Sequence, residues 1–324
     1  MTPHTPSFRR RALLTAIEGL PLALLLALCL VLGVMAPTFF QWDNLRNILL
    51  QTAVTGILAT GMTFVLLTAG VDLSVGAIMF VCSAVGGKLI FQGAPFWPVL
   101  LFILVLAALY GLLNGLLIAR FKIMAFIVTL ATLYLGRGLG LWITETRAMN
   151  LPDLFYQLGA SRFVGIPMPV LVLIIVVLLA YVTLHHTPLG RQIYAVGGDI
   201  EAARKAGIST RTVLVSAYVI CGLCAGLAAI VALCQTPAVS PSFGKDREFA
   251  AIAAAVLGGT SLFGGKGRVF PGTLLGAVLI QTVENGLNIL NTNPYLYPII
   301  TSGIIFLAVL VDSLRKLNDP SRAP

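Results

Sequence analysis

Three ionisable residues stand inside long apolar stretches: Asp72, Arg137 and Glu284. An ionised side chain is costly in hydrocarbon, so such residues usually face a water-filled cavity or a polar partner and mark the route of a solute or ion. Neutral polar side chains accompany them, and we take the whole set as candidates for a translocation path or gate: Ser74, Asn114, Asn285 and Asn288. Their common chemistry is hydrogen bonding to a polar solute or to a neighbouring helix.

Each of these candidates has a second, structural interpretation. Asp72 lies in "AGVDLSVG", where Gly70 and Gly76 interrupt the apolar run, and it could cap the following helix near the inner membrane boundary instead of touching a solute. Arg137 could extend towards the outer membrane surface. The stripe formed by Glu284 and its Asn neighbours could seal a helix interface or offer partners to a hydroxylated solute. The residues alone leave these alternatives open.

The elements that carry these residues are predicted to span a membrane. The mean hydropathy is +0.97 and only 10% of the residues are charged, whereas a soluble domain usually has about 25% charged residues. We therefore predict an all-α, polytopic membrane protein with one domain over residues 1–324 and about ten transmembrane helices, some short or broken. The apolar stretches are 13–36, 47–69, 75–92, 98–119, 123–144, 166–184, 212–234, 249–263, 270–290 and 295–312.

Basic residues predict the orientation. Lys and Arg are concentrated before the first apolar stretch, in the segment 186–211 and after the last stretch, and such residues mark the cytoplasmic side. The tails 1–12 and 313–324 and the loop 186–211 are therefore expected in the cytoplasm. The net charge of +9 mainly reflects this topology, and it requires no nucleic acid. Membrane lipid is the expected partner of the spans.

The loop 186–211 is predicted to contain a short helix. Asp199 is a good N-cap, Glu201 lies in the first turn, Arg204 and Lys205 lie in the last, and Gly207 can end the helix. A solvated connection would look similar. However, the loop is longer than a connection needs, and its small residues leave a face that another protein can approach: Ala202, Ala203 and Ala206.

Four motifs in order carry a resemblance to a known family. They are "LTAGVDLSVGA" at 67–77, "FIVTLATLYLGRG" at 126–138, "YAVGGDIEAARKAGI" at 194–208 and "AAAVLGGTSLFGGKGRVFPGTLLGA" at 253–277. The chain resembles the membrane permease subunits of bacterial ABC importers for monosaccharides of the ribose, xylose, arabinose and galactose type. It departs from them at Met124 and Ala125, where the family commonly has a proline before Phe126.

The resemblance implies a function and a set of partners. The segment 197–208 would be the coupling helix that contacts a separate ATPase subunit, through Gly198, Asp199, Glu201, Ala202, Ala203, Arg204 and Gly207. Phe126 joins the path candidates. The expected partners are that ATPase, which would use ATP and Mg²⁺, a periplasmic sugar-binding protein and a second permease copy or paralogue. The expected location is the bacterial inner membrane.

The chain itself is not predicted to be an enzyme or to bind a cofactor or metal. "TSLFGGKG" at 260–267 has Thr260 and Gly267 where a P-loop needs glycine and a hydroxyl. The five cysteines lie in or at the ends of apolar stretches without further ligands.

The outer loops 144–163 and 235–248 carry charges suited to docking the binding protein. A secondary transporter or facilitator is the alternative. Two Gly-interrupted segments, "TAGVDLSVG" and "LGGTSLFGG", are similar to the paired broken helices of repeat-built transporters, but their positions in the two halves do not correspond.

Overall fold

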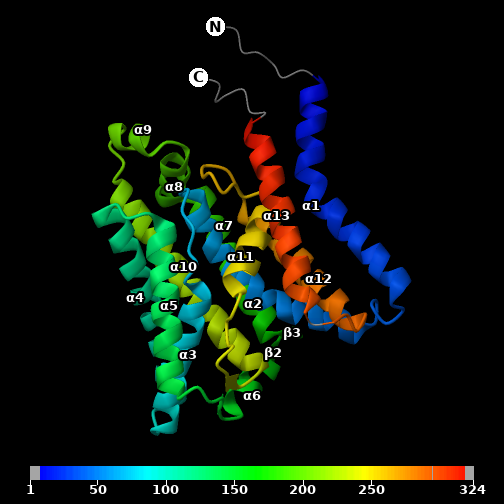
Figure 1. The fold of residues 1–324 in the computed structure, drawn as a ribbon, viewed down its shortest axis with the longest axis vertical. Coiled ribbons are helices and arrows are strands. Elements are labelled where there is room, and N and C mark those ends of the chain that lie inside the picture. The colour runs from blue at the N-terminus through cyan, green and yellow to red at the C-terminus, as the bar shows by residue number, and fades with distance from the viewer. Residues whose placement is uncertain (1–7, 294, 318–324) are drawn as a thin grey trace.

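The computed structural model describes residues 8–293 and 295–317, and these are almost entirely helical (Figure 1). The longer helices are α1 (Phe8–Met35), α2 (Trp42–Leu67), α3 (Val75–Phe91), α4 (Phe96–Phe121), α5 (Ala125–Thr144), α7 (Met168–His186), α10 (Thr210–Gln235), α12 (Leu274–Ile289) and α13 (Leu296–Leu317). Short ones are α6 (Leu154–Ala160), α8 (Pro188–Gly198), α9 (Ile200–Lys205), α11 (Arg247–Leu257) and the π-turn η1 (Val269–Thr273).

Length and hydropathy make several of these helices competent to cross a membrane. Among the described residues, five are long and apolar enough, namely α2, α4, α5, α7 and α10, and shorter apolar helices cover Pro21–Met35 and Val75–Phe91. The polytopic all-α prediction is confirmed. One predicted span is wrong: the stretch 249–263 yields only α11, whose 11 residues extend about 16 Å, half of the hydrocarbon thickness. Gly258 and Gly259 end the helix there, and Gly259 has a φ of +92°.

Helix α2 forms the centre of the bundle. Most of its side chains are buried, and it contacts α7, α10, α11 and α12. Figure 1 shows it between α3, α4, α5 and α10 on one side and α1, α12 and α13 on the other. The pair α4 and α10 packs backbone to backbone, because a Cβ on Gly222 would lie 2.4 Å from the carbonyl O of Ala107. Small residues of this kind allow close helix contact within a membrane.

The two ends of the bundle differ. Helices α8 and α9 lie at the same end as the start of α1 and the end of α13, whereas α6, β2 and β3 lie at the other end (Figure 1). At that second end, β1 (Met149–Asn150) pairs antiparallel with β4 (Ala238–Val239), and β2 (Arg162–Phe163) pairs with β3 (Ile166–Pro167). The loop 186–211 and the described ends of the chain therefore share one side, as the basic residues predict.

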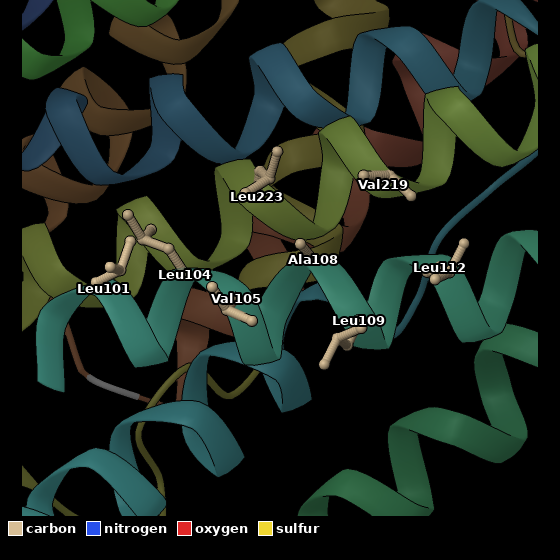
Figure 2. A pocket seen from close by; sticks show the side chains of 8 residues that line it. All are labelled: Leu101, Leu104, Val105, Ala108, Leu109, Leu112, Val219 and Leu223. Carbon is tan, nitrogen blue, oxygen red and sulfur yellow. The ribbon is translucent and has the colours of Figure 1, made fainter. Parts of the chain in front are cut away.

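The outer surface of α4 and α10 carries an apolar groove. Figure 2 shows the side chains that line it, all of them aliphatic: Leu101, Leu104, Val105, Ala108, Leu109, Leu112, Val219 and Leu223. Aliphatic side chains offer no hydrogen-bond donor or acceptor to a hydroxylated solute. The composition of this groove suits contact with lipid chains.

Candidate translocation path and coupling site

The chain leaves helical geometry between α2 and α3, over residues 68–74, which we call the first break. Hydrogen bonds to Asp72 stabilise this segment. The Asp72 carboxylate accepts from the amide of Ser74 at 2.9 Å and from its hydroxyl at 2.6 Å. The amide of Asn114 in α4 donates to the Ser74 hydroxyl at 2.8 Å. All three side chains are fully buried. Asp72 therefore bonds at the start of α3, the local role that its position suggests, and it faces no open cavity in this conformation.

The depth of this cluster follows from α4. Asn114 lies seven residues before the last residue of that helix, Phe121, which corresponds to about 10 Å along the axis. The cluster thus lies on the α8–α9 side of the bundle but inside it. Two oxygens of the cluster, Asp72 Oδ2 and Asn114 Oδ1, are buried without a hydrogen-bond partner.

Helix α9 is capped at both ends by the residues that the sequence indicates. The Asp199 carboxylate accepts from the amides of Glu201 and Ala202 at 2.8 and 3.0 Å. These bonds lower the pKa of Asp199, because they stabilise the ionised form. At the other end Gly207 has a φ of +82°, and the amide of Ile208 donates to the carbonyl of Ala203 at 3.1 Å. This is a Schellman motif, so the short helix is locally complete.

The side chains of α9 divide between two faces. Arg204 and Glu201 are exposed and form an ion pair at 2.6 Å, and Ala202 is exposed beside them. Ala203 is only 4% exposed and packs against its own chain. It therefore holds α9 in place and does not belong to the open face.

A second helix, α8, precedes α9 and was not predicted from the sequence. Thr187 caps it by accepting from the Gly190 amide at 3.3 Å, and Pro188 occupies its first position. Both residues are local signals for a helix start, so the sequence did carry this information. The loop 186–211 is thus a pair of helices.

Helix α8 meets the end of α2 and the loop 258–268 at a three-way backbone junction. The amide of Gly265 donates to the carbonyl of Leu67 at 3.0 Å. A Cβ on Gly197 would lie 1.7 Å from that carbonyl O and 2.7 Å from the Gly265 N, so only glycine fits at 197. Nearby, the Tyr194 hydroxyl donates to the carbonyl of Gly267 at 2.8 Å. The junction ties the α8–α9 pair to the central helix.

A second break (residues 236–246) lies between α10 and α11, and here the structure corrects the prediction. The segment 235–248 was expected wholly outside. Instead, the Arg137 guanidinium, near the middle of α5, donates to the carbonyl of Phe243 at 2.6 Å. Arg247 lies 3.5 Å from the hydroxyl of Thr55, in the middle of α2. The chain thus turns inward after β4, and α11 begins near mid-depth.

The two breaks meet at the start of α3. A Cβ on Gly76 would lie 2.2 Å from the carbonyl O of Gly244 and 2.3 Å from Glu248 Oε2, so the absence of a side chain at 76 permits this contact. Glu248 is 5% exposed. The segment 236–246 therefore contacts the first turn of α3, whereas "LGGTSLFGG" contacts the end of α2 at Leu67 and the first break itself, because a Cβ on Gly264 would lie 2.8 Å from the Cβ of Ala69.

The remaining candidates are distributed over α5 and α12. Asn285 exchanges side-chain amide bonds with Asn44 at 2.8 and 3.1 Å, which seals α12 against α2. Glu284 accepts from Gln281 at 3.0 Å and lies 3.9 Å from Arg247. Asn288 is exposed, and Phe126 is 54% exposed on the first turn of α5. Arg137 also lies over the Phe80 ring, 5.5 Å from its centroid.

Comparison with known proteins decides the family. Residues 44–311 match a family described as "Branched-chain amino acid transport system / permease component". The chain belongs to this permease family. The permease is 40% identical to the ribose import permease protein of Escherichia coli (strain K12), over 98% of this chain and 100% of the relative.

Two further relatives carry other sugar names. The D-allose transport system permease protein of Escherichia coli (strain K12) is 36% identical over 88% of each chain. The fructose import permease protein of Rhizobium meliloti is 34% identical over 92% of this permease and 86% of the relative. No solved structure matches the permease. The family match spans both breaks and the α8–α9 pair.

Proposed function

We propose that this permease is the membrane subunit of an ATP-driven importer for a monosaccharide. The observation that carries the proposal is the α8–α9 pair, an exposed and fully capped helical element that is joined by backbone contacts to the central helix. Three relatives with sugar-import names support the substrate class. The family description also covers branched-chain amino acids, so leucine belongs among the solutes to be tested.

Energy would enter through α9. A separate ATPase subunit, which uses ATP and Mg²⁺, would dock on the exposed face around Glu201, Ala202 and Arg204. Nucleotide binding would favour one position of α9, and the junction at Gly197 and Leu67 would pass this preference to α2. This is a population shift: the ATPase changes the balance between inward-open and outward-open states by binding one of them better.

The other end of the bundle would receive the solute. We expect a periplasmic sugar-binding protein to dock near α6 and the paired strands β1 and β4. A second copy or a paralogue would complete the path. This arrangement requires the bacterial inner membrane, with both termini in the cytoplasm on the α8–α9 side.

The first experiment tests partner and docking site together. The tagged permease is purified from its native membrane in mild detergent, beside a variant in which residues 199–206 are replaced by a Gly/Ser linker, and copurifying proteins are identified by mass spectrometry. A P-loop ATPase recovered with the native chain and lost with the variant is the expected result. If no ATPase is recovered in several detergents, and the permease alone moves a sugar in liposomes, the proposal is wrong.

A secondary transporter is the competing class. It would lose uptake when ion gradients are collapsed while ATP is kept constant. The importer proposed here would keep its uptake under those conditions and lose it when ATP is depleted. Uptake of labelled ribose, allose, fructose and leucine, measured in cells under both conditions, separates the two classes and the two solute types.

A further inference from the structure

Charged side chains near mid-depth are exposed on the single chain. Lys245 and Asp246 lie on the second break and are exposed, although their neighbours Phe243 and Arg247 contact the middles of α5 and α2. Hydrocarbon cannot accommodate exposed charges at this depth at low cost. This face of the permease must therefore border water or another protein, unlike the apolar groove of Figure 2.

Two buried polar atoms beside this face have complementary unmet hydrogen-bonding roles. Arg137 Nη2 is a donor and Glu248 Oε2 is an acceptor, and neither has a hydrogen-bond partner. The two groups attract one another electrostatically, yet no ion pair joins them in the part of the chain that the structure describes. A hydroxyl group can accept from one and donate to the other at the same time.

Asp246 adds a third group. It occupies the N-cap position of α11 with a φ of +61°, but its side chain makes no capping bond. Its carboxylate is thus not used to stabilise the helix that it begins, and it interacts electrostatically with Arg137. A carboxylate and a guanidinium together bind neighbouring hydroxyls of a neutral polyol through charge-assisted hydrogen bonds.

We propose that Arg137, Asp246 and Glu248 form a binding site for the hydroxyl groups of the transported solute halfway across the membrane. The site rests on the proposed function, and it adds Asp246 and Glu248, from a segment that looks external in the sequence, to the path. Its ligand class is a neutral polyhydroxylated molecule. Lys245 marks the aqueous opening of the site.

Uptake by the complete importer tests the ligand contact. Asp246→Asn keeps the size of the side chain and removes its charge, and we expect sugar uptake to fall about tenfold or more, the effect of losing a hydrogen bond to a charged group. Asp43→Asn is the matched control, because Asp43 is also an exposed aspartate at a helix start, in the first turn of α2, and lies outside the proposed docking segments. It should transport like the native chain.

Thiol labelling in proteoliposomes tests whether water reaches the site. The native cysteines are buried, apart from the half-buried Cys29, so the native chain gives the background. Lys245→Cys should react with a small charged thiol reagent but not with a maleimide on a long polyethylene glycol chain. Arg162→Cys, in the outer strand β2, should react with both. Leu109→Cys, in the apolar groove, should react with neither.

The outcomes separate this site from the proposed function. If the native complex imports no sugar, the proposed function fails. If it imports sugar and Asp246→Asn transports equally well, or Lys245→Cys is unreactive with and without nucleotide, the site is wrong and the function stands. If Asp246→Asn no longer copurifies with its partner subunits, Asp246 holds copies together, which also overturns the site.

Discussion

Both breaks reach the interior of the bundle, but their polar groups are used differently. In the first break, residues 68–74, Asp72 and Ser74 are fully buried and bonded to each other and to Asn114. In the second break, residues 236–246, Lys245 and Asp246 are exposed, and the Asp246 side chain does not cap its helix. Each break is followed by a helix, α3 or α11. The Asp72 carboxylate bonds at the start of α3, whereas the Asp246 carboxylate makes no bond at the start of α11.

The polar groups of the first break hold helices in position, whereas those of the second break are free to contact a solute. A buried network whose members bond to one another fixes the relative positions of α3 and α4, and it is costly to disturb. An exposed carboxylate with no structural partner can be changed at little cost to the fold. Substitutions in the first break should therefore reduce stability, whereas substitutions in the second should reduce transport by folded molecules.

The largest effect is expected beside the first break, at the junction where α8 meets the end of α2. Gly197→Ala places a methyl group 1.7 Å from the carbonyl O of Leu67, so the backbone junction must separate. We expect ATP-driven uptake to be abolished while the ATPase still copurifies. Gly303→Ala, within α13, is the control, because nothing lies within 4 Å of a Cβ there, and normal uptake is expected. Equal uptake by the two variants would show that the junction does not transmit motion.

The next effect is a loss of stability within the first break. Asn114→Ala removes the donor to the Ser74 hydroxyl and leaves a buried polar group without its partner, at a cost of about 1–3 kcal/mol in the free energy of unfolding. Thermal inactivation in detergent measures this as a lower midpoint. Asn47→Ala, at an exposed position of α2, should leave the midpoint unchanged. A native midpoint for Asn114→Ala would remove the contrast between the two breaks.

The sequence predicted the parts of the molecule that are set locally. Asp199 and Gly207 cap α9 through bonds within a few residues of the chain, and the interruption around Asp72 is visible as a polar island in an apolar run. The position of Asn114 beside Ser74, across 40 residues, has no local signal. Only packing of α4 against the first break brings them together.

The depth of the second break could not be predicted for a physical reason. Lys245, Asp246 and Arg247 are charged, as expected in a loop outside the bilayer, and hydropathy alone places them there. Their place inside the bundle depends on contacts with Thr55 and Arg137, which lie on helices that are far away in the sequence. The glycine at 76 is the one indication, since it allows the second break to approach α3.

A smaller effect is expected at α9, the helix proposed to contact the ATPase. Asp199→Ala removes both capping bonds, so α9 should fray and recovery of the ATPase should fall a few-fold, whereas Asp199→Asn can still cap. The pKa of Asp199 is lowered, so its ionised cap contributes above the ordinary value of about 3.9 and is lost only as pH falls through the lowered pKa. Asp199 therefore stays ionised between about pH 5 and 8, and its titration should cause no change in the amount of ATPase that copurifies over this range. Loss of the ATPase from Asp199→Asn as well would mean that the charge itself is recognised.

The smallest effect is expected in the apolar groove. Leu109→Met conserves volume at a side chain that is 54% exposed, and such substitutions change the free energy of unfolding by about 0.5 kcal/mol or less. Uptake and thermal midpoint should both match the native chain, because lipid chains contact leucine and methionine alike. If Leu109→Met lowered uptake as much as Asp246→Asn, the groove would be the functional face. Exposure would then not distinguish a lipid surface from a path, and the charges near mid-depth would have to be explained by contact between subunits.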